Sequence, residues 1–268
     1  MTNRDTNPGE ESEKVVRSTF KMLAEWQTKV AQPYRPDAAT DLEVDDQDWP
    51  GFPTSTVAWS GLSAATDHLN AIRRHVEAGQ LFPMAHSTLC RTALVGAAQV
   101  VWVLAPKDRA DRLARSRTIV AYVYKNHLQY LRGLQGLSDT PHTGTDTVAN
   151  LVDQRINELA LKRAADNQNE NLNTTKMIKE AAQSAFTGAG LVEQVVLAWQ
   201  SGSGAAHGLP WHLFGTPGMS QTAPAGSDGV AEFAAVGSLS RIANAFMAAF
   251  HLSEHGWRML EQRGSAAP

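Results

Sequence analysis

Cysteine, charge and long apolar runs are all scarce in this chain, and each scarcity excludes a class of protein. Cys90 is the only cysteine among 268 residues, so no internal disulfide can form, which fits a reducing cytoplasm. Charged residues make up 19% of the chain, below the roughly 25% usual for soluble domains. The most apolar stretch, residues 94–105, is shorter than the ~20 residues that cross a bilayer. We therefore expect a cytoplasmic protein with no membrane partner.

Motifs for nucleotide binding and for secretion are also missing. There is no phosphate loop of the form G-x-x-x-x-G-K-[ST] and no strand-linked G-x-G-x-x-G, so we expect no nucleotide cofactor. The first residues, "MTNRDTNPGEESEK", contain no apolar core and do not predict a signal peptide. A net charge of −3 gives no global attraction to nucleic acid. Nucleic-acid binding should therefore be weak or absent.

Strand-type alternation is absent too, apart from one short candidate extended piece at residues 211–214. Apolar residues instead recur at spacings of three and four, which indicates helices. The predicted helices cover residues 11–31, 54–79, 83–105, 108–131, 148–165, 177–187, 191–199 and 230–262. The sequence therefore predicts an all-α fold, a bundle of about eight helices in one main domain.

Residues 1–53 are expected to form an appendage to a helical bundle domain at residues 54–268. The appendage comprises a disordered tail, the N-terminal helix and an acidic, proline-rich linker. The linker holds four prolines, and six carboxylates lie between Asp37 and Asp48. Prolines disfavour a helix there, and the charge should keep much of the segment solvated.

The stretch "KDRADRLARSR", residues 107–117, places Arg109, Arg112 and Arg115 along one helical edge, with Arg117 beside them. We call Arg109, Arg112 and Arg115 the arginine ridge. Arginine offers forked donors, so the ridge is a candidate phosphate- or RNA-binding surface. It could equally be a solvated face, or it could be covered by the acidic linker. We rank these two interpretations above nucleic-acid binding.

Two histidine patterns suggest enzymes. His251 and His255 in "HLSEH" match H-x-x-E-H and share a helix face, as zinc ligands do. A third ligand is lacking, because only thirteen residues follow and Glu261 is their sole carboxylate, so we expect no bound metal. His86 and Cys90, also four apart, could form a nucleophile pair, but a buried structural cysteine is the commoner outcome.

The small-residue stretch "AWQSGSGAAHG", residues 198–208, carries a resemblance to a known group of proteins. It resembles a signature, S-x-x-A/V-H-G, found late in all-helical proteins of high-GC bacteria. Those proteins also have an earlier helix of the kind R-x-A-L-x-x-A-x-x-x-W-x-L-x-P followed by arginines. The matching residues here are Arg91, Ala93, Leu94, Trp102, Leu104 and Pro106.

Such proteins are distantly similar to the HEPN superfamily, helical bundles that include RNA-cleaving toxins and partner-binding modules. In the ribonuclease members, an arginine precedes the catalytic histidine with four to six residues between the two. Ahead of His207 the corresponding positions are Gln200, Ser201 and Gly202, so the resemblance does not bring ribonuclease chemistry to this chain.

His207, Ser203, Arg91 and Trp199 are therefore candidates for a structural hub or a ligand site. The helix is expected to stop at Trp199, and His207 is expected to be buried in the following turn, with Arg91 as one candidate partner. The leading hypothesis is a non-catalytic cytoplasmic interaction or regulatory module that forms a homodimer and could bind a protein partner. The alternatives are an RNA- or nucleotide-phosphate-binding protein that uses the arginine ridge with His207, and a metal-dependent hydrolase using His251 and His255.

Overall fold

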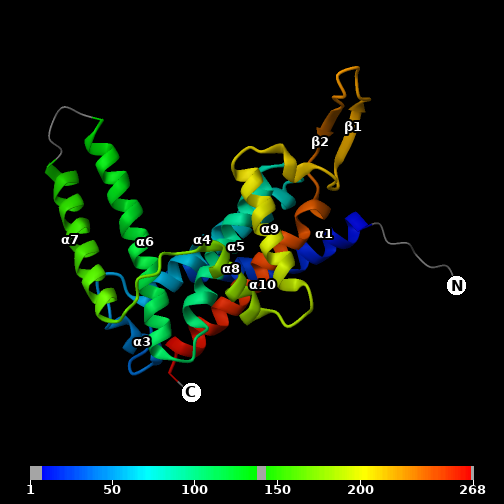
Figure 1. Cartoon of the computed structure of the whole chain (residues 1–268). Helices are drawn as coiled ribbons and strands as arrows, with labels where there is room; N and C mark the ends of the chain where they lie inside the picture. The colour runs from blue at the N-terminus through cyan, green and yellow to red at the C-terminus, as the bar shows by residue number, and fades with distance from the viewer. Residues whose placement is uncertain (1–7, 138–142, 267–268) are drawn as a thin grey trace.

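The computed structural model describes residues 8–137 and 143–266, which form a predominantly all-α single domain, as the sequence predicts (Figure 1). The helices are α1 Pro8–Ser18, α2 Phe20–Val30, α3 Asp41–Asp46, α4 Thr54–Glu77, α5 Ala85–Leu104, α6 Arg109–Gln135, α7 Thr143–Ala165, α8 Thr174–Ala185, α9 Leu191–Ala206 and α10 Leu239–Gly264. A short 3-10 helix, η1 Pro210–Leu213, and an antiparallel hairpin, β1 Met219–Ala223 with β2 Glu232–Ala235, lie between α9 and α10.

Helix α5 lies at the centre of the bundle and packs against α4, α8, α9 and α10. Within the described ranges, it is the one helix whose length and composition would allow it to cross a membrane. Its apolar side chains, such as Leu94 and Val101, are buried against neighbouring helices, as in the core helix of a bundle.

Two glycines allow α4 and α5 to cross with their backbones in close approach. A Cβ atom on Gly61 would lie 2.7 Å from the carbonyl oxygen of Gly96, and one on Gly96 would lie 2.6 Å from that of Gly61. Real Cβ atoms do not approach backbone oxygens so closely, so both positions need glycine while the helices keep this separation.

The N-terminal segment is part of the core. Val16, Leu23 and Trp26 are buried as α1 and α2 pack on α10 and α4, and Trp26 stacks on Phe250.

The linker also differs from expectation, because residues 41–46 form α3. Thr40 caps α3 by accepting the backbone N–H of Glu43, and basic side chains of other helices pair with Asp41 and Asp45. Capping and pairing thus allow a helix between the flanking prolines.

Three boundaries near the C-terminus were also predicted wrongly. Helix α9 does not stop at Trp199 but runs through the small residues to Ala206. The hairpin replaces the predicted start of the last helix, which begins at Leu239 rather than Val230. The extended piece expected at residues 211–214 is instead largely the 3-10 turn η1.

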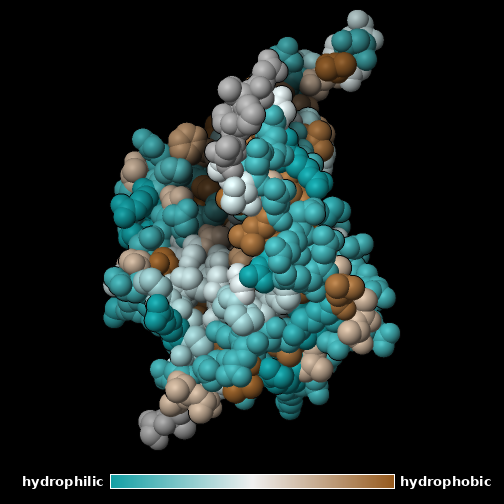
Figure 2. All heavy atoms as spheres, turned by 90° about the vertical axis from the view of Figure 1, so that its left-hand side faces the viewer, coloured by the Kyte–Doolittle hydropathy of each residue, from teal (hydrophilic) through white to brown (hydrophobic). Residues whose placement is uncertain are grey.

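Two elements project from the body. Helices α6 and α7 form an antiparallel pair that stands away from the bundle, and we call this pair the arm (Figure 1). The β1–β2 hairpin projects on the opposite side. Viewed from the side of the arm, the surface shows brown apolar residues set among teal hydrophilic ones (Figure 2).

Candidate functional site

The acidic linker lies against the arginine ridge, as one of the three interpretations of the ridge predicts. Asp45 is fully buried and accepts from both Nε and Nη2 of Arg112, at 2.7 and 3.2 Å. The remaining Nη1 of Arg112 donates to the carbonyl of Lys107 at 2.9 Å. Arg109, on the outer side, contacts the same Asp45 at 3.1 Å and donates to the carbonyl of Val44 at 2.9 Å. The linker thus supplies acceptors for these two arginines.

Arg117 occupies a second such site further along α6. It donates two hydrogen bonds to Asp48, at 2.7 and 2.6 Å, and it pairs with Asp166 at the end of α7. Burial alone would raise the pKa of Asp48, but hydrogen bonds from Arg117 and Lys162 outweigh it and hold that pKa below its usual value. Arg117 therefore ties the linker, α6 and the end of α7 together.

Arg115, the third member of the ridge, turns to the other side of α6. It forms an ion pair with Glu180 at 3.1 Å, donates to the carbonyl of Trp102 at 2.8 Å and lies over the indole of Trp102. Arg109, Arg112 and Arg115 are therefore all paired within the fold. The phosphate-binding interpretation needs free guanidinium groups, and the structure gives this surface an internal, structural role instead.

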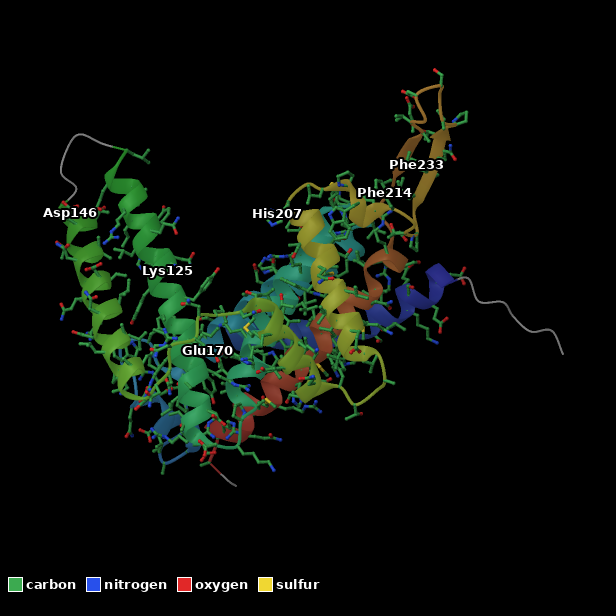
Figure 3. The ribbon with its side chains drawn as sticks, viewed as in Figure 1. Lys125, Asp146, Glu170, His207, Phe214 and Phe233 are labelled. Carbon is green, nitrogen blue, oxygen red and sulfur yellow. The ribbon has the colours of Figure 1, made fainter. Side chains whose placement is uncertain are left out.

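The structure brings two of the four candidate hub residues together across helices. Ser203 accepts a hydrogen bond from Nε of Arg91 at 2.8 Å, which joins α5 to α9, and it donates to the carbonyl of Trp199 within α9 at 3.0 Å. His207 was expected to be buried there. It is exposed at the C-terminal end of α9, and its side chain makes no hydrogen bond among the described residues (Figure 3). The helix runs on past Trp199 and carries His207 out to the surface.

The histidine pairs do not assemble catalytic sites within the described residues. His251 is exposed beside Glu254, and His255 contacts Arg258 at 3.3 Å. No three His, Cys, Asp or Glu side chains gather as metal ligands in the part of the chain that the structure describes. The expectation of no bound metal stays a prediction.

His86 faces His75 rather than Cys90 in the hydrogen-bond network, with 3.0 Å between their ring nitrogens. Cys90 is buried, and burial raises the pKa of its thiol to about 12. A thiol that holds its proton so firmly is a poor nucleophile, so the pair is structural.

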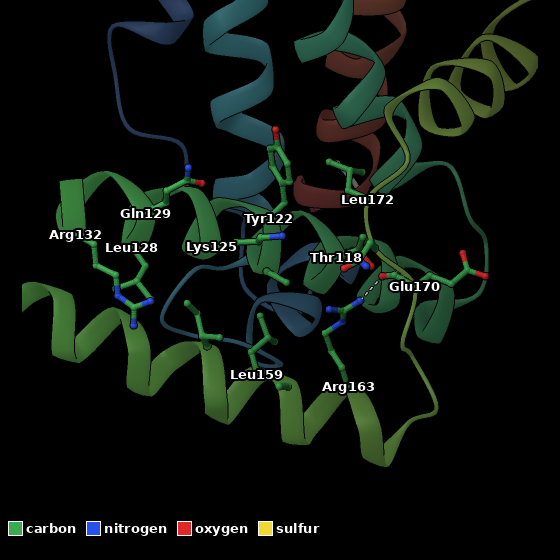
Figure 4. A pocket seen from close by; sticks show the side chains of 14 residues that line it. Thr118, Tyr122, Lys125, Leu128, Gln129, Arg132, Leu159, Arg163, Glu170 and Leu172 are labelled. Atoms are coloured by element: carbon green, nitrogen blue, oxygen red, sulfur yellow. Dashed lines mark hydrogen bonds between the residues drawn. The ribbon is translucent and has the colours of Figure 1, made fainter.

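A cavity of about 650 Å³ forms a cleft along the arm, between α6, α7 and the segment that leads to α8 (Figure 4). We call it the arm cleft. Its apolar residues are buried or partly buried: Leu128, Ile156, Leu159 and Leu172. Figure 4 shows Leu159 and Arg163 of α7 pointing toward α6.

Cationic groups line the same cleft. Lys125 is exposed and has no hydrogen-bond or ion-pair partner within residues 8–137 and 143–266. Arg163 donates from Nη2 to the carbonyl of Glu170, but its Nε is buried without a partner. Burial, reinforced by the nearby charge of Arg117, lowers the pKa of Arg163. The cleft combines an apolar floor with positive charge that its own acids do not fully neutralise.

Sequence reasoning missed this site. The charge pattern of the sequence indicates the arginines at residues 107–117 instead, and these arginines are paired within the fold. Lys125 could have indicated this site. It is a basic residue on α6, C-terminal to the arginines that pair with the acidic linker.

Comparisons of this chain with known protein families, with curated proteins and with solved structures found no match. The resemblance to HEPN-like proteins therefore stays a prediction.

Proposed function

We propose that this protein is a non-catalytic interaction module that binds an acidic, amphipathic helix of a partner protein in the arm cleft. One observation carries the proposal: an apolar floor lies beside the unpaired Lys125 and the incompletely paired Arg163. Helix-in-groove recognition uses apolar anchors on one helix face, and complementary charge sets orientation and partner choice.

The shape of the arm supports this occupant. Helix α7 packs on α6 and lies apart from the central bundle, so the pair forms a single layer (Figure 1). A single pair of antiparallel helices leaves a groove that a third helix can fill, burying the floor residues Leu128 and Leu159 further. Carboxylates on the incoming helix would then meet Lys125 and Arg163.

The other functions considered have weaker support. RNA or phosphate binding would need the arginine ridge and His207, but the ridge is paired and His207 lies at the end of a different helix, α9. A metal-dependent hydrolase would need a third ligand near His251 and His255. The homodimer also stays a proposal. Light scattering tests it, because a dimer has twice the mass of the 29.0 kDa chain.

The proposal is tested with two designed helical peptides of equal length, one Leu/Glu and one Leu/Lys, followed by fluorescence anisotropy. We expect the acidic peptide to bind and the Lys125→Glu variant to weaken binding about tenfold, since a like charge then faces the peptide. Lys179→Glu is the matched control, because Lys179 is an exposed lysine on α8 outside the cleft. Equal effects of the two variants, or no binding of the acidic peptide, would contradict the proposal.

A further inference from the structure

A second pocket, of about 290 Å³, lies away from the arm, between α9, η1 and the first turns of α10. Ser87 of α5 contributes to its wall. Its lining combines polar side chains, among them Arg241, His212 and Thr216, with apolar ones such as Ile242. Three residues from the small-residue stretch at residues 198–208 also contribute to its lining: Ala198, Ser201 and Gly202.

Arg241 lines this pocket with most of its hydrogen-bonding capacity unused. Its Nε donates to the hydroxyl of Thr216 at 3.1 Å, but Nη1 and Nη2 are hidden from solvent and have no partner. No carboxylate lies within ion-pair distance of Arg241 in the described part of the chain, and burial lowers its pKa. A buried guanidinium is costly unless an anion or acceptors satisfy it.

His212, which also lines this pocket, supplies a second unsatisfied group. Its side chain is almost completely buried, with 4% exposed. The Nδ1 atom lies 2.7 Å from the carbonyl of Leu209, and a carbonyl only accepts, so Nδ1 carries the hydrogen. The other ring nitrogen, Nε2, is buried without a partner. Protonated, it would donate to an anion; neutral, it would accept from a ligand hydroxyl.

We propose that this pocket binds a small organic anion, with its carboxylate or phosphate head against Arg241 and His212. The two Nη atoms of arginine match two oxygens of such a head group in a bidentate pair. Apolar residues such as Ile242 and Ala198 also line the pocket, beside polar ones such as Asn244, and they suit a short apolar body on the ligand. A volume of 290 Å³ is close to the lower limit of about 300 Å³ for small-molecule sites. The site is independent of the arm cleft.

The two head groups are distinguished by measuring the melting temperature with inorganic phosphate and with butyrate. Each is used at about 20 mM, with sodium chloride of equal ionic strength as the reference. At least one should raise the melting temperature by roughly 3 °C and bind with 1:1 stoichiometry in calorimetry. Loss of the response to both in Arg241→Gln is expected, whereas Arg258→Gln, an exposed arginine on the same helix, should respond like the parent.

Arg241→Gln also removes an unpaired buried charge, so it should melt at a higher temperature than the parent in anion-free buffer. His212→Asn keeps a donor for the carbonyl of Leu209 but lacks Nε2, and it should weaken anion binding about tenfold without loss of the fold. A pocket that merely holds water predicts no anion-specific shift in the parent. That result, or a shift retained in Arg241→Gln, would overturn the proposal.

Discussion

At the scale of single residues, buried polar groups in this protein are held in specific protonation states. His86 is the clearest case. The backbone N–H of Phe82 donates to its Nδ1 at 3.3 Å, so Nδ1 carries no proton and Nε2 donates to His75. Burial disfavours the charged imidazole, and a positive charge on the neighbouring His75 would disfavour it further, so the pKa of His86 is lowered from 6.5 to about 4.

This shift predicts a pH dependence of stability. Between about pH 6.5 and pH 4, His86 is protonated in the unfolded chain but neutral in the folded protein. The free energy of unfolding therefore falls as the pH falls. Above pH 6.5 His86 is neutral in both states and has no effect; the loss of stability reaches about 2 kcal/mol at pH 5 and up to about 3 kcal/mol below pH 4. Urea denaturation at pH 7.5 and pH 5 measures it.

In His86→Asn the pH dependence over this range should be smaller, whereas His127→Asn, which changes an exposed histidine on α6, should behave like the parent. Identical slopes for the parent and His86→Asn would show that other groups control the acid sensitivity.

At the scale of elements, close helix packing depends on glycine at the crossing of α4 and α5. Gly96→Ala should lower the free energy of unfolding by about 1–3 kcal/mol, because its Cβ would overlap the carbonyl oxygen of Gly61. Gly133→Ala on α6 is the control, since no neighbouring atom lies within 4 Å, and it should be neutral or stabilising by up to about 1 kcal/mol. Chemical denaturation of both variants checks the difference. Equal effects would mean that the crossing relaxes freely.

Periodicity predicted most of the helices well, because each buries apolar residues against a neighbouring helix. It failed where tertiary contacts override local preference. Helix α9 continues through residues 200–206 because Gly202 packs directly on Arg91, a close approach that a serine- and glycine-rich segment does not reveal. The hairpin was missed since its strands are mostly exposed and show no alternating apolar pattern.

The candidate sites were predictable only in part, for the same reason. Charge complementarity suggested, as one of three interpretations, that the linker lies against the ridge, and it does so at Arg109 and Arg112, because both partners are visible as runs in the sequence. Arg241 and His212 lie 29 positions apart on different elements, and neither stands in a run or a motif. Their proximity depends on how α9 and α10 pack, so sequence spacing alone gave no reason to pair them.

At the scale of the whole molecule, the internal pairing of the ridge predicts weak RNA binding. Single-stranded RNA should show no saturable binding at physiological salt, because few cations are free to release counterions. Arg109→Glu is the variant to use, since Arg109 is half-exposed whereas Arg112 is buried on Asp45. Tight RNA binding at ~150 mM salt, lost in Arg109→Glu while the melting temperature stays unchanged, would restore the nucleic-acid hypothesis.

The central claim is that the arm cleft is the interaction surface of this protein. Amide hydrogen exchange with and without the acidic peptide tests it most directly, because exchange reports which backbone segments a bound helix protects. The account predicts protection confined to residues 118–132, 156–163 and 170–172, with no change in α9 or at the ridge residues 107–117. Protection centred on α9 or on residues 107–117, with the arm unchanged, would contradict it.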